Sequence, residues 1–412
     1  MKISSLKFTK TRNAVLGVGI LAEPLLTAYG LIAFILRKDL HATPFQIAVL
    51  TMLRPVVALL SLYWSHAIAD RRDKLLSNVI IAGVLSYIPF LFFPFIENAW
   101  FVVACAAFHM MMRRGGIPAW MEILKLNLPA SERGRLFSLG ASISYIEGVF
   151  LAIPMGLLLD MDGSQWKWLF PVCALFGIAS LILQAQIPIE LEKVPMLDKP
   201  SGSTTFQKLL DPWKNAFSLL KKRSDYSRFQ LGFMICGFGI MIIQPILPIY
   251  FVDVLQMSHL DMFLALSLCR GLGYALTASP WAQLFNRINI YQFTSFPCFI
   301  VSFFCLCLIF AQWSISLVYL AYFAYGVFLA GQHLSWNLAG TVFARDEDST
   351  LFTSVGVAAV GLRGAVAPPL GSLLCLFLGP IPVMGMGMCI CAYSGLKMYE
   401  WGRPRLLTSV DL

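Results

Sequence analysis

The sequence predicts an all-α membrane protein of twelve transmembrane helices, arranged as two six-helix pseudo-symmetric bundles. Three observations support this fold class: the composition, the repeated long apolar runs and the uneven distribution of basic side chains. The chain has 412 residues, of which 58% are hydrophobic and only 13% are charged. A soluble domain of this composition could not cover its surface with polar groups, so lipid is the expected solvent.

Apolar runs of about 20 residues recur along the whole chain, and each is long enough to cross about 30 Å of hydrocarbon as a helix. Because backbone groups must pair internally in lipid, the alternative is a closed β-barrel. A barrel needs strict alternation of apolar and polar residues, whereas Val79–Phe95 is apolar on almost every face. The twelve predicted spans are residues 14–35, 45–68, 76–96, 98–120, 136–159, 168–188, 230–253, 260–284, 291–311, 315–338, 352–378 and 380–396.

Basic side chains indicate the orientation of these spans. Of the 31 Lys and Arg residues, 23 lie on the side that holds the amino terminus and 5 lie inside spans, while the opposite side has only Arg37, Lys38 and Lys167. By the positive-inside rule, both termini are expected in the cytoplasm, with the protein in a cytoplasmic (inner or plasma) membrane. The net charge of +9 therefore fits a lipid bilayer as partner and does not indicate nucleic acid.

One long polar stretch, residues 189–228, separates six spans from six and predicts two bundles, 1–188 and 229–412. A shift of 216 residues places Arg54 on Arg270 and Trp120 on Trp336, which indicates duplicated halves of the same orientation. Within the linker, apolar residues from Phe206 to Leu220 recur at helical spacing among lysines. This pattern predicts an amphipathic helix on the inner leaflet, and a calmodulin-like partner site is the alternative.

The segment His66–Lys74 contains an Asp70-Arg71 pair between spans two and three. It resembles the Gly-x-x-x-Asp-Arg-x-Gly-Arg-Arg loop of the major facilitator superfamily, although His66 and Asp73 stand where the family has glycines. The resemblance covers essentially the whole chain and implies rocking-type alternating access around a central cavity. It also implies that Asp70 and Arg71 belong to a cytoplasmic gate; the alternative is that these bases only fix the topology.

Ionisable residues at membrane depth are candidates for function because each costs about 3 kcal/mol or more unless it faces protein or water. Glu23 in span one and Glu147 in span five are the two acids predicted well inside the hydrocarbon. Because the hydrocarbon penalises the charged form of an acid, both are candidate proton carriers. A fixed ion pair with a nearby arginine is the alternative for each.

Arginines outnumber these acids, so we expect the cavity to attract an anionic or carboxylate-bearing solute through forked hydrogen bonds. Polar residues on other spans are predicted to complete the site or, alternatively, to form interhelical hydrogen bonds. The predicted substrate-binding residues are Arg54, Arg113, Arg270, Arg363, His109, Gln244, Gln332, His333 and Asn337.

Enzymatic chemistry is not expected, because no zinc-protease, esterase or phosphate-binding motif occurs in the sequence. No metal or other cofactor is predicted, and the ten cysteines fit small buried apolar residues. The preferred function is a monomeric secondary active transporter of a small, anionic organic solute, coupled to protons. A non-transporting receptor or regulator on the same scaffold is the alternative.

Overall fold

The computed structural model describes residues 5–69, 74–189, 217–344 and 349–403, and every regular element within these ranges is a helix. In this part of the chain, nine helical segments are long and apolar enough to cross a membrane. The other three predicted spans, 45–68, 98–120 and 136–159, fall on the helices α4 (Pro44–Ala69), α6 (Ala99–Asn127) and α7 (Ala130–Met161). The all-helical membrane fold is therefore confirmed.

Contacts divide the chain into two units, which we call the first unit (Met1–Ser201 with Leu247–Leu268) and the second unit (Gly202–Ile246 with Cys269–Leu412). The segment Leu247–Leu268 thus groups with the first unit although it follows the predicted linker. The linker helix proposed at 206–220 lies mostly outside the described residues, so it stays a prediction.

The first unit contains, besides α4, α6 and α7, the elements α1 (Ser5–Leu21), α2 (Glu23–Gly30), α3 (Ile32–Lys38), α5 (Leu75–Tyr87), η2 (Ile88–Phe95), η3 (Gly163–Gln165), α8 (Trp166–Ala185), η4 (Tyr250–Val254) and α12 (His259–Phe263). The second unit contains α10 (Ser224–Ile243), α13 (Arg270–Phe285), α14 (Ile290–Phe310), α15 (Ser316–Ala344), α16 (Ser349–Leu378) and α17 (Pro380–Gly402). The short elements α11 (Ile246–Ile249) and η5 (Leu264–Cys269) connect the two.

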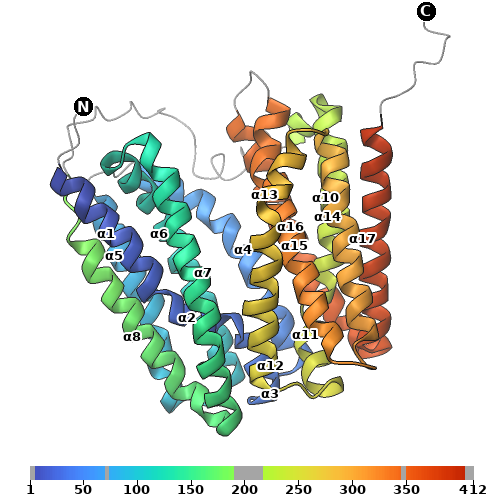
Figure 1. Ribbon diagram of the computed structural model, residues 1–412, viewed down its shortest axis with the longest axis horizontal. Helices are drawn as coiled ribbons and strands as arrows, with labels where there is room; N and C mark the ends of the chain where they lie inside the picture. The colour runs from blue at the N-terminus through green and yellow to red at the C-terminus, as the bar shows by residue number, and fades with distance from the viewer. Residues whose placement is uncertain (1–4, 70–73, 190–216, 345–348, 404–412) are drawn as a thin grey trace, which may run out of the picture. The chain divides into compact units, whose positions relative to one another are not determined.

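The predicted span 14–35 is divided into α1, α2 and α3 (Figure 1). Pro24 lies in the first turn of α2 and has no backbone N–H, so it cannot continue the hydrogen bonds of α1. The helix breaks at Ala22 in consequence. After the break, α2 continues the packing of α1 against α7 and α8, which places Glu23 beside α7.

Aromatic side chains fill the core of the first unit near η2. Phe90 stacks on Phe170 with ring centroids 5.6 Å apart, and Phe93 meets the edge of Trp166 at 5.6 Å. All four side chains are buried. These contacts join η2 to α8, and offset or edge-on pairs of this kind add attraction beyond the area they bury.

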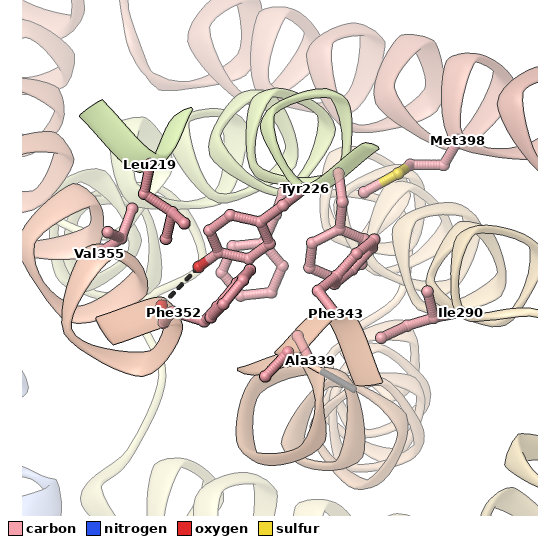
Figure 2. Packing of buried hydrophobic residues seen from close by; sticks show 11 residues of the cluster. Leu219, Tyr226, Ile290, Ala339, Phe343, Phe352, Val355 and Met398 are labelled. Carbon is pink, nitrogen blue, oxygen red and sulfur yellow. Dashed lines mark hydrogen bonds between the residues drawn. The ribbon is translucent and has the colours of Figure 1, made fainter. Parts of the chain in front are cut away.

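The core of the second unit joins α10, α15, α16 and α17 through a second aromatic cluster (Figure 2). The Tyr226 hydroxyl donates a hydrogen bond of 2.6 Å to the backbone oxygen of Phe352, so its polar tip is satisfied inside an apolar core. Phe343 packs against Tyr226 with ring centroids 5.3 Å apart, and Met398 belongs to the same cluster.

Large apolar side chains also cover the outside of the helices. Phe95, Phe150, Met161 and Phe377 are each more than 70% exposed. Such exposure would favour aggregation in water, whereas lipid tails are as apolar as these side chains and can surround them without cost. The surface therefore supports the membrane assignment independently of helix length.

Glycines let helix backbones approach closely in the second unit. A Cβ atom on Gly371 of α16 would overlap the backbone oxygen of Ile242 in α10 and lie 3.0 Å from the Ile242 Cα. Lipid tails are as apolar as leucine, so helices associate in a membrane mainly through such close packing. Gly371 is therefore a requirement of the α10–α16 contact.

We expect Gly371→Ala to destabilise the protein by about 1–3 kcal/mol, because the added methyl group must push α10 and α16 apart. Gly385→Ala in α17 is the matched control, since a Cβ there would have no neighbour within 4 Å. Thermal unfolding of both purified variants in detergent measures the difference. Equal melting temperatures for the two variants would contradict the proposed backbone contact.

Candidate functional site

The two intramembrane acids lie in the first unit, where α2 meets α7. Glu23 stands at the start of α2 and accepts a 3.3 Å hydrogen bond from the Thr27 hydroxyl one turn later. A Cβ atom on Gly148 of α7 would lie 3.0 Å from the Glu23 carboxylate and 3.2 Å from the Thr27 hydroxyl. The missing side chain of Gly148 therefore makes room for the Glu23 carboxylate.

Glu147, the residue before Gly148, is partly buried, and its Oε2 atom is fully buried without a hydrogen-bond partner among the described residues. It acts electrostatically on Glu23, as does Arg113 of α6. Within the described part of the chain, neither acid forms an ion pair with an arginine. A fixed pair with arginine stays the alternative for each acid, because the side chain of Arg54 lies outside the described structure and Arg113 acts electrostatically on Glu23.

His109 of α6 is 2% exposed and lies within an aromatic setting. Its Nδ1 atom is 2.9 Å from the backbone oxygen of Ser86, and because a carbonyl only accepts, Nδ1 carries the proton. The rings of Tyr29 and Phe90 have centroids 5.3 and 5.1 Å from the imidazole. This is the packing of a satisfied core histidine, and the substrate-binding role stays a prediction.

Arg363 of α16 is the most buried of the predicted arginines whose side chains the structure describes, with 6% of the residue exposed. Its Nη1 atom donates a 2.8 Å hydrogen bond to the backbone oxygen of Phe233, and its guanidinium lies 5.5 Å from the centre of the Phe233 ring. The Nε atom is buried without a partner in the described structure. Gly237, one turn after Phe233, leaves the space that the guanidinium occupies.

Arg270 begins α13 and is partly buried, and its Nε atom also has no hydrogen-bond partner in the described residues. Tyr322 of α15 is close enough to interact with it electrostatically. On the same two helices, the Tyr274 hydroxyl lies 3.3 Å from His333 Nδ1. This face of α13 and α15 therefore combines a guanidinium, phenols and an imidazole.

The remaining predicted residues are less constrained. Gln244 and Gln332 are partly buried, and Arg113 is exposed. The side chains of Arg54 and Asn337, and the whole of Asp70 and Arg71, lie outside the described structure. Their roles in binding and gating stay predictions.

A small cavity occurs in the second unit between α10, α15 and α16, and half of the residues that line it are aromatic. Two of its polar side chains are already engaged: Gln230 donates to the Tyr226 hydroxyl at 3.0 Å, and Ser335 bonds Thr294 at 2.9 Å. None of the predicted site residues lines it. It is a packing feature of the core, and the polar residues described above are the better candidates for solute binding.

The sequence profile of the Major Facilitator Superfamily matches residues 18–368. The chain belongs to the Major Facilitator Superfamily. No curated protein sequence matches it. Membership confirms the resemblance inferred from the loop after the second span, and a transporter family of this kind does not indicate an enzyme.

Solved structures with the fold of this superfamily member include a mutant of the nucleoside transporter NupG, with a TM-score of 0.74, 11% identity and coverage of 95% of this chain and 100% of that chain. A POT family transporter in complex with 5-aminolevulinic acid has a TM-score of 0.70, 12% identity and coverage of 95% and 96%. A D-xylose-proton symporter has a TM-score of 0.65, 14% identity and coverage of 97% and 98%. At these identities the similarity establishes the fold.

Sequence reasoning identified the acids of this superfamily member but missed the residues that position them. Thr27 lies four residues after Glu23, a spacing that places both on one helix face, so it could have been found. Gly148 and Gly237 gave no such signal, because a glycine matters here only through the side chain that a neighbouring helix places in the space beside it. Their partners, Glu23 and Arg363, lie on other helices.

We expect Gly237→Ala to displace the Arg363 guanidinium and to destabilise the protein by about 1–3 kcal/mol, because the new methyl group overlaps that side chain. The same substitution made in an Arg363→Ala background should cost much less, since the overlap is gone. Thermal unfolding of the wild type, both single variants and the double variant completes the cycle. An equal cost in the two backgrounds would show that the two residues do not compete for space.

Proposed function

We propose that this chain is a secondary active transporter that carries a small anionic organic solute by alternating access and couples its movement to protons. The observation that carries the proposal is the pattern of incomplete pairing at membrane depth. Arg270 and Arg363 keep buried Nε donors unpartnered within the described residues, and the Oε2 atom of Glu147 is buried there without a hydrogen-bond partner.

The guanidinium groups support an anionic solute. A buried donor that the protein leaves unsatisfied costs about 1–3 kcal/mol, and a carboxylate brought by a solute would satisfy it. Arginine is suited to this because its planar fork binds a carboxylate through two hydrogen bonds. Of the two, Arg270 is the better placed, since Arg363 already donates to Phe233.

The acids support proton coupling. A low-dielectric setting penalises the charged form of a carboxylate, so an acid at membrane depth is suited to binding a proton. Glu23 is held by Thr27, and Glu147 acts electrostatically on it, so the two acids bring like charges close together. The structural neighbours named for a proton symporter and for 5-aminolevulinic acid fit this proposal.

The same proposal includes the topology and the assembly. Both termini would lie in the cytoplasm, the membrane would be the cytoplasmic one, and the transporter would act as a monomer. The charge distribution of 23 basic residues against 3 supports the orientation.

Arg270→Gln should abolish uptake of the solute while leaving the amount of folded protein unchanged, because the amide cannot form a charged fork with a carboxylate. The solute is first found by presenting labelled organic anions, nucleosides and peptides to expressing cells, with and without a proton uncoupler. Arg287→Gln, at an exposed position just after α13, is the matched control and should transport normally. Normal uptake by the Arg270 variant would remove this residue from the binding site.

Glu23→Gln and Glu147→Gln should separate coupling from binding. In proteoliposomes we expect the variant of the true proton carrier to lose accumulation driven by a pH gradient but to keep solute exchange at equal pH, since exchange needs no net proton transfer. Glu97→Gln, an exposed acid in the loop after η2, should retain both activities. Gradient-driven accumulation by both variants would contradict the assignment of either acid.

A further inference from the structure

A cluster of charged side chains lies where the ends of α3 and α7 meet the start of α12, all within the first unit. Figure 1 shows α3 and α12 at the same end of this unit. The charge distribution predicts that this end is non-cytoplasmic. The segment that carries α12, Leu247–Leu268, continues directly into α10 on one side and α13 on the other, so it connects the first unit to helices of the second.

Two basic residues at the end of α3 hold this segment. The Arg37 Nε atom lies 3.0 and 3.1 Å from the two carboxylate oxygens of Asp253, and its Nη1 atom donates to the Ala42 carbonyl at 2.9 Å. Lys38 donates to the backbone oxygen of Met257 at 2.8 Å. These contacts hold the segment against α3, but neither of them involves its histidine, His259.

His259, the first residue of α12, lies between two acids. Its Nε2 atom is 3.0 Å from Asp39 Oδ2, its Nδ1 atom is 3.0 Å from Asp160 Oδ1, and only 3% of its side chain is exposed. The Asp160 carboxylate also accepts the backbone N–H of His259 at 2.7 Å and that of Leu260 at 3.0 Å. Asp160 of α7 thus caps α12 from outside and binds its histidine.

The number of protons in this cluster follows from the donor count. Ionised carboxylates only accept hydrogen bonds, and a neutral imidazole has one donor and one acceptor. With a neutral ring, one of the two 3.0 Å contacts would set a nitrogen lone pair against a carboxylate oxygen. Both contacts are satisfied together when both ring nitrogens carry a proton.

Charged groups around the cluster favour the same state. Asp253 is paired with Arg37, Lys38 is bound to a carbonyl, Asp261 caps α12 together with Ser258, and Asp162 caps η3 through Ser164. This leaves two carboxylates facing one ring. An imidazolium reduces their repulsion, whereas a neutral ring would leave two negative charges at one buried site.

We propose that Asp39, His259 and Asp160 form a proton-binding site, in which an imidazolium between two carboxylates locks Leu247–Leu268 onto the first unit. Undocking of the segment separates the ring from both carboxylates, so the acceptors that hold its second proton are lost and that proton is released. Docking is therefore favoured as pH falls. The role of this lock in a transport cycle rests on the proposed function, but the docking equilibrium itself needs no solute.

Hydrogen–deuterium exchange of the full-length protein in lipid nanodiscs measures the docking. After correction for the intrinsic dependence of exchange on pH, the peptide that contains the amides of His259 and Leu260 should open up to about tenfold more per pH unit above neutral, because one proton is released. In His259→Gln this dependence should disappear. His41→Gln, at an exposed histidine close to the same end, should behave as the wild type does.

Nitrogen-15 NMR of histidine-labelled protein tests the protonation directly, and the His259 signal is assigned by its loss in His259→Gln. We expect both ring nitrogens of His259 to carry a proton while the segment is docked. Should His259→Gln fail to fold, Asp39→Asn provides the test, since loss of one carboxylate should shift both the NMR titration and the exchange profile to lower pH. A neutral His259 ring, or wild-type exchange that does not change with pH after correction, overturns the proposal. These measurements need no solute, so they can support the proton-binding site even if the proposed transport function fails, and the reverse is also true.

Discussion

The structure depends on one constraint: a polar or charged group at membrane depth must find its partner within the protein, because lipid tails offer none. The constraint explains why every described regular element is a helix. It also means that a buried polar atom without a hydrogen-bond partner marks a place where a solute or proton could bind. The donors of Arg270 and Arg363 and the carboxylate of Glu147 are such places within the described residues, and a moving solute or proton is a partner that a transporter can use.

Close packing is the second consequence of the same solvent. Since apolar side chains gain nothing by leaving lipid for a neighbouring helix, backbones must approach closely to attract each other. Gly371 permits this for α16 and α10. Gly148 and Gly237 use the same freedom differently, because the space they leave is filled by the polar ends of Glu23 and Arg363. Packing and polar chemistry are thereby linked at the same helix contacts.

Much of the fold could be predicted from hydropathy and charge alone. The twelve predicted ranges fall on helices because a run of about twenty apolar residues has no other stable form in lipid. The position of Glu23, Glu147 and Arg363 on long helices was equally predictable, since it follows from their place within a predicted span. The grouping of Leu247–Leu268 with the first unit was not, because it arises from contacts between residues far apart in the sequence, such as Arg37 with Asp253.

The sequence could not show which of the site's side chains contact each other. The rotation of each helix, and breaks such as the one before Pro24, decide which side chains meet. His259 illustrates this point: it reads as an isolated histidine beside a span, and only the fold brings Asp39 and Asp160 to its two ring nitrogens. Conversely, Arg363 lies within a predicted span, as a solute-binding arginine would, but its Nη1 atom already donates to the backbone oxygen of Phe233.

The central claim, that anion movement and proton movement are linked in this chain, is tested most directly by pH changes inside proteoliposomes that contain it as their only protein. A pH-sensitive dye in the lumen reports proton entry while a panel of organic anions is added outside. The account predicts that at least one anion causes a lumenal pH change that protein-free liposomes do not show. Transport of a labelled solute without any accompanying pH change would contradict it.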